Sequence, residues 1–214
     1  MIGQSEILNY LKTKSLNLSF IDKLKVNYRP LICPFDVLLK YVDKNDAVFD
    51  IGCGSGQFCA LIAKFTTATT IHGIEISETL VSNAKAINQE FKEEKKITFE
   101  VFDGNTIPNE IEQYGIIYMI DVLHHIPKNK QIIFLKEIYS KMAIGSKLIL
   151  KDIDADHIFV YFNKMHDLVF SKEIGNEISL PLAKKTVKSL GFKIIEDFSK
   201  TTFIYPHYFL ILEK

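Results

Sequence analysis

The chain has 214 residues, a length that fits one folded domain or one domain with a modest addition. Apolar residues make up 47% of it, which favours a packed globular protein over a disordered one. The 26 basic residues balance the 26 acidic ones, and this disfavours proteins that bind nucleic acid through a strongly basic face.

Cysteine usage and hydropathy exclude further classes of protein. The three cysteines form no C-x-x-C pair, so we expect neither a disulfide framework nor a structural zinc site. The N-terminal stretch has no basic start followed by an apolar block, and no run approaches the roughly 18 apolar residues of a spanning helix. We therefore expect no signal peptide, no transmembrane segment and a cytoplasmic location.

The apolar pattern alternates between strands and amphipathic helices. Residues 5–26 predict short helical pieces, and another short helix follows Pro34. Apolar or β-branched runs predict strands at 47–51, 69–76, 97–102, 116–121 and 147–152. Between them, apolar side chains three and four positions apart predict helices over about 58–65, 78–91 and 132–142. This order favours an α/β fold with a mainly parallel sheet and helices on both faces.

The C-terminal part departs from this alternation. Two strands, 192–198 and 208–212, are separated by nine residues, too few for a crossover helix, so we expect them to be antiparallel. An aromatic-rich insert, residues 154–180, precedes the last helix. We interpret the chain as one domain, 1–214, with an N-terminal helical cap at 1–34 and the insert as a helical lid.

A glycine-rich turn follows the first strand. The sequence there is Asp50-Ile51-Gly52-Cys53-Gly54-Ser55-Gly56. Glycines allow positive φ and close approach of a ligand, and the start of the next helix offers free N–H groups. The G-x-G-x-x-G fingerprint of dinucleotide-binding proteins fails because its sixth position is Gln57, which disfavours a nicotinamide oxidoreductase.

Acidic residues follow the next two strands. Glu75 ends the second strand, 19 residues after Gly56 (75 − 56), where a carboxylate is placed to bind the ribose hydroxyls of an adenosine. Asp103-Gly104 follows the third strand and offers a carboxylate beside backbone amides for an adenine amino group, although Asp-Gly is also a common turn.

Four segments together, DIGCGSG, HGIE, VFDG and IDVLHHIP, resemble the ordered motifs of the Rossmann-like S-adenosylmethionine-dependent methyltransferases. The resemblance covers about residues 28–152. It implies a three-layer α/β sandwich around a seven-stranded sheet, with an antiparallel last strand inserted next to the fifth. It also implies S-adenosylmethionine as cofactor, with contacts at Asp50, Gly52, Cys53, Gly54, Glu75, Ile76, Asp103, Gly104 and Asp121.

The segment before the glycine turn, YRPLICPF, is similar to the corresponding segment of small bacterial members of this family. Upstream residues there often cover the methionine carboxylate of the cofactor. Arg29 suits this role because a guanidinium matches a carboxylate, and Tyr28 is the alternative. A solvated arginine before a proline turn remains an equal interpretation.

The cofactor implied by the resemblance already activates the methyl group, so the protein mainly aligns acceptor, methyl and sulfur. A base is needed where the acceptor keeps a proton until late. His125 is our preferred base, with His124 and His166 as further candidates. We expect no metal site, because no histidine pair has H-x-x-x-H spacing.

The acceptor is the least constrained part of the function. Family members that methylate planar amino groups often carry Asp-Pro-Pro-Tyr after the fourth strand, where this chain reads Asp121-Val122-Leu123-His124. We expect a small, partly apolar acceptor methylated on oxygen beneath the insert, and no nucleic-acid partner. A tRNA or protein methyltransferase and a catalytically idle binding or interaction module stay open as alternatives, and so does the oligomeric state.

Overall fold

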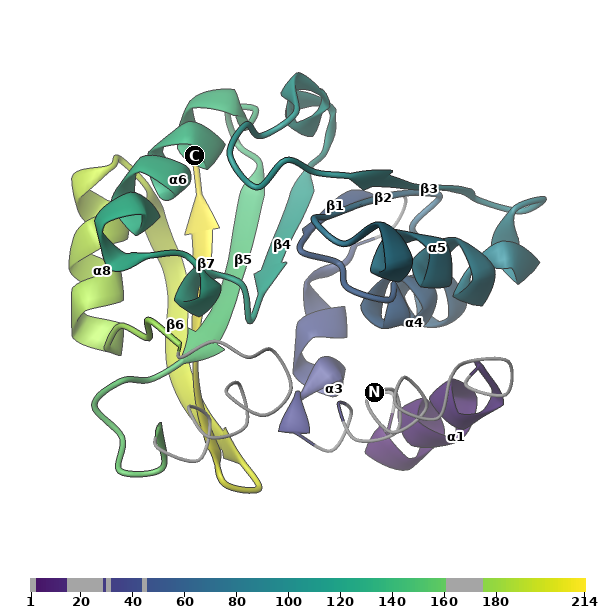
Figure 1. Ribbon diagram of the computed structural model, residues 1–214, viewed down its shortest axis with the longest axis horizontal. Helices are drawn as coiled ribbons and strands as arrows, with labels where there is room; N and C mark the ends of the chain where they lie inside the picture. Colours follow the sequence, from purple (N-terminus) through teal and green to yellow (C-terminus); the bar gives the residue numbers. More distant parts are fainter. Residues whose placement is uncertain (1–2, 15–28, 30–31, 44–45, 161–174) are drawn as a thin grey trace. The chain divides into compact units, whose positions relative to one another are not determined.

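The computed structural model describes residues 3–14, 29, 32–43, 46–160 and 175–214. These residues form two compact units, Met1–Gly104 and Asn105–Lys214. Each unit combines parallel strands with helices, as the alternating pattern predicts (Figure 1).

The first unit is built on three parallel strands: β1 (Ala47–Ile51), β2 (Thr70–Glu75) and β3 (Lys96–Val101). Its helical elements are α1 (Gln4–Lys14), α3 (Phe35–Leu38), η1 (Leu39–Tyr41), α4 (Gln57–Phe65), α5 (Glu78–Ile87) and η2 (Gln89–Phe91). α4 is buried along most of its length, because seven of its nine residues pack into the core. Ser77 is the N-cap of α5, since its side chain accepts a hydrogen bond from the Leu80 N–H at 3.4 Å.

The second unit holds β4 (Ile116–Ile120), β5 (Lys147–Ile153), β6 (Lys193–Thr202) and β7 (Tyr205–Glu213). β4 and β5 are parallel, whereas β7 pairs antiparallel with both β5 and β6. The helical elements are η3 (Asn109–Gln113), η4 (Leu123–His125), α6 (Lys128–Lys141) and α8 (Leu180–Ser189).

Hydrogen bonding orders the seven strands β3-β2-β1-β4-β5-β7-β6. The last strand is antiparallel and lies next to β5, as expected from the resemblance. The α/β fold with a mainly parallel seven-stranded sheet is therefore confirmed. In such a sheet the loops that follow β1, β2, β3, β4 and β5 are where ligands bind.

Two details differ from the sequence prediction. The nine residues expected between the last strands are mostly strand, because β6 and β7 extend to Thr202 and Tyr205 and leave a two-residue turn. α6 buries Gln131 in a line with Phe134 and Ile138, while Ile132 and Ile133 are exposed. The apolar pattern alone therefore predicts the wrong buried face of α6, because hydrogen bonds hold the polar Gln131 side chain in the core.

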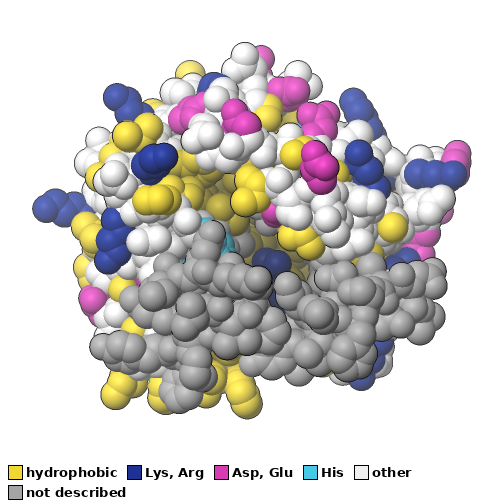
Figure 2. All heavy atoms as spheres, viewed as in Figure 1, with side chains coloured by type: hydrophobic (Ala, Val, Ile, Leu, Met, Phe, Trp, Pro, Cys, Tyr) yellow, Lys and Arg dark blue, Asp and Glu magenta, His cyan; other side chains and the backbone are white. Residues whose placement is uncertain are grey.

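Basic and acidic side chains both occur on the described surface that faces the viewer in Figure 2, and neither covers it. Among the described residues, every helix is too short or too polar to cross a membrane.

Candidate active site

The glycine-rich turn joins β1 to α4 and bends the backbone three times. Gly52, Gly54 and Gly56 have φ values of 72°, 55° and 71°, a region that residues with a Cβ atom rarely adopt. Gly56 is also the N-cap of α4. The turn therefore presents backbone N–H groups at a helix N-terminus, an arrangement suited to polar ligands.

The surroundings of Gly56 and Gly54 differ. A Cβ atom on Gly56 would lie 2.7 Å from the Cβ of Ala84 and 2.8 Å from the Asn88 amide nitrogen, so this glycine lets α5 pack closely. A Cβ on Gly54 would meet, among the described residues, a single neighbour within 4 Å, the Nη1 atom of Arg29 at 3.3 Å. Gly54 thus faces space that a ligand can use beside a guanidinium.

Glu75 holds the same turn from the end of β2. Its carboxylate oxygens accept hydrogen bonds from the N–H groups of Gly54 and Ser77, both at 3.1 Å. The residue is 9% exposed, so the carboxylate is anchored at the sheet edge and still reachable. Each oxygen has a further lone pair, which is what two adjacent hydroxyl donors require.

Asp50 lies beneath the turn and is almost completely buried. Cys59 of α4 donates its S–H to Oδ2 of Asp50 at 3.3 Å. Burial raises the pKa of Asp50 to about 7, and the charge of Glu75 adds to the rise, while the Cys59 hydrogen bond and the charge of Arg29 oppose it. Sequence analysis missed Cys59 as a partner, because only the fold brings the two residues together.

The remaining predicted cofactor residues of this unit fall at the strand ends. The Cys53 side chain is buried against β2, where Gly73 leaves room for its Sγ atom, so only its backbone belongs to the turn. Ile76 is exposed and lies beside Gly104, whose Cβ position is 3.6 Å from the Ile76 Cγ2 atom. Asp103 is exposed in the adjoining loop. Tyr28 lies outside the described residues.

In the second unit, the end of β4 is strained. Asp121 has a φ of 56°, unusual for a residue with a side chain, and its N–H donates to the Lys151 carbonyl at 2.9 Å. The Lys151 ammonium group, fully buried, lies 2.5 Å from Oδ1 of Asp121. Sequence analysis missed Lys151, because a lysine within an apolar strand gives no sign of its partner.

His124 follows β4 and is buried against Asp152 of β5. Its Nδ1 atom lies 2.5 Å from Oδ1 of Asp152, and its backbone N–H donates to Oδ2 at 3.1 Å. His125 is exposed, and its ring centroid is 4.2 Å from that of His124. The two adjacent histidines therefore differ in burial. His166 lies outside the described residues.

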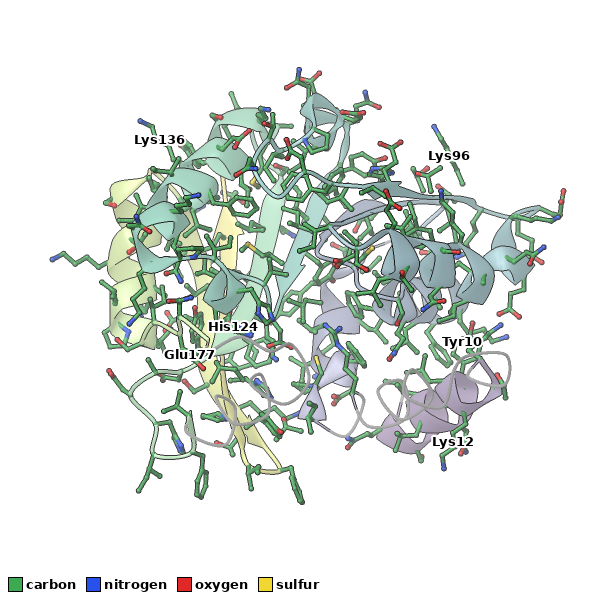
Figure 3. The ribbon with its side chains drawn as sticks, in the orientation of Figure 1. Tyr10, Lys12, Lys96, His124, Lys136 and Glu177 are labelled. Atoms are coloured by element: carbon green, nitrogen blue, oxygen red, sulfur yellow. The ribbon has the colours of Figure 1, made fainter. Side chains whose placement is uncertain are left out.

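The end of the insert contacts the backbone of His124. The Asn176 N–H donates to the His124 carbonyl at 2.6 Å, and Gln131 donates to the Asn176 carbonyl at 2.8 Å. Buried Glu177 comes from the same segment and is labelled with His124 in Figure 3. The end of the insert thus packs onto η4.

The side chains of Asp121, His124 and Asp152 place three potential metal-ligand atoms within 4.8 Å of one another. Sequence spacing did not predict this grouping. The Lys151 ammonium already faces Asp121 at ion-pair distance, and a divalent cation would have to bind beside that positive charge. We therefore assign the positive charge at this position to Lys151.

Comparison with known proteins adds independent information. A methyltransferase domain family matches residues 42–195. A ubiquinone biosynthesis O-methyltransferase of Coxiella burnetii is 28% identical over 131 residues, 59% of this chain and 53% of its own length. A sterol 24-C-methyltransferase of Saccharomyces cerevisiae is 23% identical over 175 residues, 78% of this chain and 45% of its own. The chain thus spans about half the length of these curated relatives.

The fold is also found in solved structures. Magnesium protoporphyrin IX methyltransferase from Synechocystis, solved with bound S-adenosylhomocysteine, superposes with a TM-score of 0.71 at 19% identity, covering 99% of this chain and 96% of that one. The family match spans well over half of the chain and includes the glycine turn, Glu75 and the strand ends. The chain therefore belongs to the S-adenosylmethionine-dependent methyltransferases of this α/β fold.

Proposed function

We propose that the chain transfers the methyl group of S-adenosylmethionine to an oxygen atom of a small, partly apolar acceptor. The observation that carries this proposal is the buried contact between His124 and Asp152 directly after β4. A hydroxyl group has to lose its proton on methylation, and a histidine beside a carboxylate is suited to take it.

The first unit supplies groups that fit the cofactor. Glu75 would bind the ribose hydroxyls, and the backbone of Gly52 and Gly54 would approach the methionine part, with Asp50 beneath it. Arg29 would pair with the methionine carboxylate, since its guanidinium lies over Gly54. When bound, the cofactor supplies a methyl group already activated by a sulfonium.

The other predicted contacts are proposals of the same kind. Asp103 and Gly104, next to Ile76, would contact the adenine base of the cofactor. The backbone of Cys53, in the glycine-rich turn, would also contact the cofactor. Asp121 is a further candidate, because it is held in a strained conformation at the end of β4.

The choice of a small acceptor rests on charge and on the relatives. A neutral chain gains little from counterion release, which drives binding to nucleic acid. The two curated relatives are named for ubiquinone biosynthesis and for a sterol, both small molecules with apolar parts.

Residues 1–34 and 154–180 are our candidates for a cap and a lid of a single methyltransferase domain. Ile158, in the described part of the insert, is 75% exposed, whereas Val160 is buried. An exposed apolar side chain there would contact an apolar acceptor. Slower hydrogen exchange in 154–160 on addition of acceptor and S-adenosylhomocysteine would support this, and unchanged exchange would contradict it.

An acceptor screen tests the proposed function. The purified protein and S-adenosylmethionine are incubated separately with small phenols, small carboxylic acids, tRNA and a protein extract, and formation of S-adenosylhomocysteine is measured. We expect turnover with hydroxylated small molecules. Turnover with tRNA or protein alone would contradict the acceptor class. Binding of S-adenosylhomocysteine without turnover on any acceptor would indicate an idle binding module.

A further inference from the structure

The hydroxyl group of Tyr208 is buried in the core of the second unit. The residue lies in β7 and is fully buried, and among the described residues no hydrogen-bond partner reaches its phenol oxygen. A buried O–H without a partner is unfavourable and rare in folded proteins. Phenylalanine would fill the same place without this cost, so the hydroxyl group calls for a functional explanation.

The position of Tyr208 links it to the His124 contact. Tyr208 pairs directly with Asp152 across the antiparallel β5–β7 ladder, so both side chains lie on the same face of the sheet. Burial raises the pKa of the Tyr208 phenol well above its usual range, and the charges of Asp152, Asp154 and Asp121 add to the rise. The group therefore stays protonated and can act as a hydrogen-bond donor.

Asp152 also fixes the orientation of the His124 ring. Its Oδ1 atom accepts from His124 Nδ1 at 2.5 Å and from the Ile153 N–H at 2.7 Å, and its Oδ2 atom accepts from the His124 N–H. With Nδ1 donating to the carboxylate, the neutral ring keeps its basic lone pair on Nε2. This tautomer follows from the hydrogen-bond partners.

We propose that His124, Asp152 and Tyr208 form the oxygen-binding site for an acceptor that carries a phenolic or enolic hydroxyl and a second oxygen nearby. The inference rests on the proposed function and names its acceptor class. The reacting hydroxyl donates to His124 Nε2, and the second oxygen accepts the O–H of Tyr208. Asp152 is a positioning residue that holds the histidine ring.

Methyl transfer moves the positive charge from sulfur to the histidine. The acceptor oxygen forms a bond to the methyl carbon, the bond from that carbon to sulfur breaks, and its electron pair stays on sulfur. The hydroxyl proton passes to His124 Nε2. The positive charge of the sulfonium thus ends on the imidazolium of His124, where the carboxylate of Asp152 stabilises it.

The first test uses Tyr208→Phe with catechol and phenol as acceptors. Loss of one donor should lower kcat/KM for catechol about tenfold, mainly through KM, and leave that for phenol unchanged. Because the hydroxyl has no hydrogen-bond partner among the described residues, the variant should have a Tm equal to or above that of the wild type. Tyr205→Phe, on the same strand, is the matched control and should keep the preference for catechol. A lowered Tm with an unchanged preference for catechol would assign the hydroxyl a structural role and overturn the inference.

The second test uses His124→Asn, with His124→Gln as a second variant if the first does not fold. We expect kcat for catechol to fall about a hundredfold with the Kd of S-adenosylhomocysteine unchanged. 4-Nitrophenol in alkaline buffer is already ionised and needs no base, so its methylation should be largely retained. Asp152→Asn should follow the same pattern.

The outcomes separate the two proposals. If the wild type methylates none of these phenols and binds none of them by calorimetry, the acceptor class named here is wrong. If it methylates other small hydroxylated molecules in the acceptor screen, the proposed function stands. If it methylates catechol and the His124 and Tyr208 variants behave as the wild type does, the inference is overturned while the proposed function again stands.

Discussion

At the scale of single residues, Gly54 and Gly145 have the same kind of backbone conformation and different surroundings. Their φ values are 55° and 81°. Gly145 has no described atom within 4 Å of its Cβ position, whereas Gly54 faces Arg29 in the proposed cofactor site. Substituting each glycine in turn therefore distinguishes the effect of backbone strain from the loss of cofactor binding.

We predict that Gly54→Ala and Gly145→Ala both lower the free energy of unfolding by about 1–2 kcal/mol, because a Cβ disfavours positive φ. Gly54→Ala alone should weaken S-adenosylhomocysteine binding tenfold or more by calorimetry, and Gly54→Val should abolish it. Equal affinity in Gly54→Ala and Gly145→Ala would place the cofactor elsewhere.

Glu75 anchors the same turn and is our candidate ribose ligand. Glu75→Ala removes up to two charge-assisted hydrogen bonds to the cofactor, so binding should weaken by about 1–3 kcal/mol in calorimetry. Glu78→Ala, at an exposed position in the first turn of α5, is the control and should keep its affinity. A folded Glu75→Ala protein with unchanged Kd would refute the assignment.

Asp50 makes stability depend on pH. Its pKa is about 7 in the folded protein and 3.8 as a free side chain, so folding favours its protonated form. The resulting stabilisation is fully present at pH values below the pKa of Asp50 in the unfolded chain, and it is lost as the pH rises to about 7. The wild-type free energy of unfolding, relative to that of Asp50→Asn, should fall by roughly 4 kcal/mol across this range.

Chemical denaturation at several pH values measures this difference, with exposed Asp43→Asn as the control. A constant difference between the wild type and Asp50→Asn would show that folding does not raise the pKa of Asp50.

Sequence alone places residues that lie within one local motif. The glycine turn follows β1 and Glu75 ends β2, as their spacing predicts, and their contacts with the cofactor stay predictions. Lys151 and Tyr208 were missed, because their significance depends on partners from other strands. For the catalytic base, the sequence offers only a choice among histidines, of which we preferred His125. We now propose His124 instead, because it is buried beside a carboxylate.

At the scale of elements, α6 holds the histidine segment through one side chain. The Nε2 atom of Gln131 lies 2.8–3.0 Å from three carbonyl oxygens, those of Leu123, Ile126 and Asn176. Leu123 begins η4 and Ile126 directly follows it, whereas Asn176 belongs to the end of the insert.

We predict that Gln131→Ala lowers the free energy of unfolding by about 1–3 kcal/mol, because it leaves buried carbonyl groups without a donor. It should also reduce turnover, because η4 positions His124. Lys130→Ala, on the exposed side of the same helix, should change neither quantity. Denaturation and a turnover assay of both variants check this, and a fully stable, fully active Gln131→Ala protein would contradict the role given to Gln131.

The elements with regular periodicity were well predicted, whereas their ends and faces were less so. β1 matches its prediction because an apolar run ends at glycines. β6 and β7 extend further than expected, because their added residues are polar or aromatic and gain their order from pairing with each other.

At the scale of the whole molecule, the alternation of strands and helices predicts an α/β fold, and the family resemblance predicts a seven-stranded sheet with an antiparallel last strand next to the fifth. The comparisons and the structure confirm both. The acceptor was not fixed in the same way, because family members share the cofactor motifs and differ in the segments around the strand ends.

The central claim is that this chain methylates an oxygen atom of a small hydroxylated molecule. The most direct measurement uses S-adenosylmethionine labelled with ¹³C in its methyl group and catechol as acceptor, followed by NMR and mass spectrometry of the product. We predict that the label appears as an O-methyl ether and that the signal disappears in His124→Asn. A label on carbon or nitrogen, or a label recovered only in RNA or protein, would contradict the account.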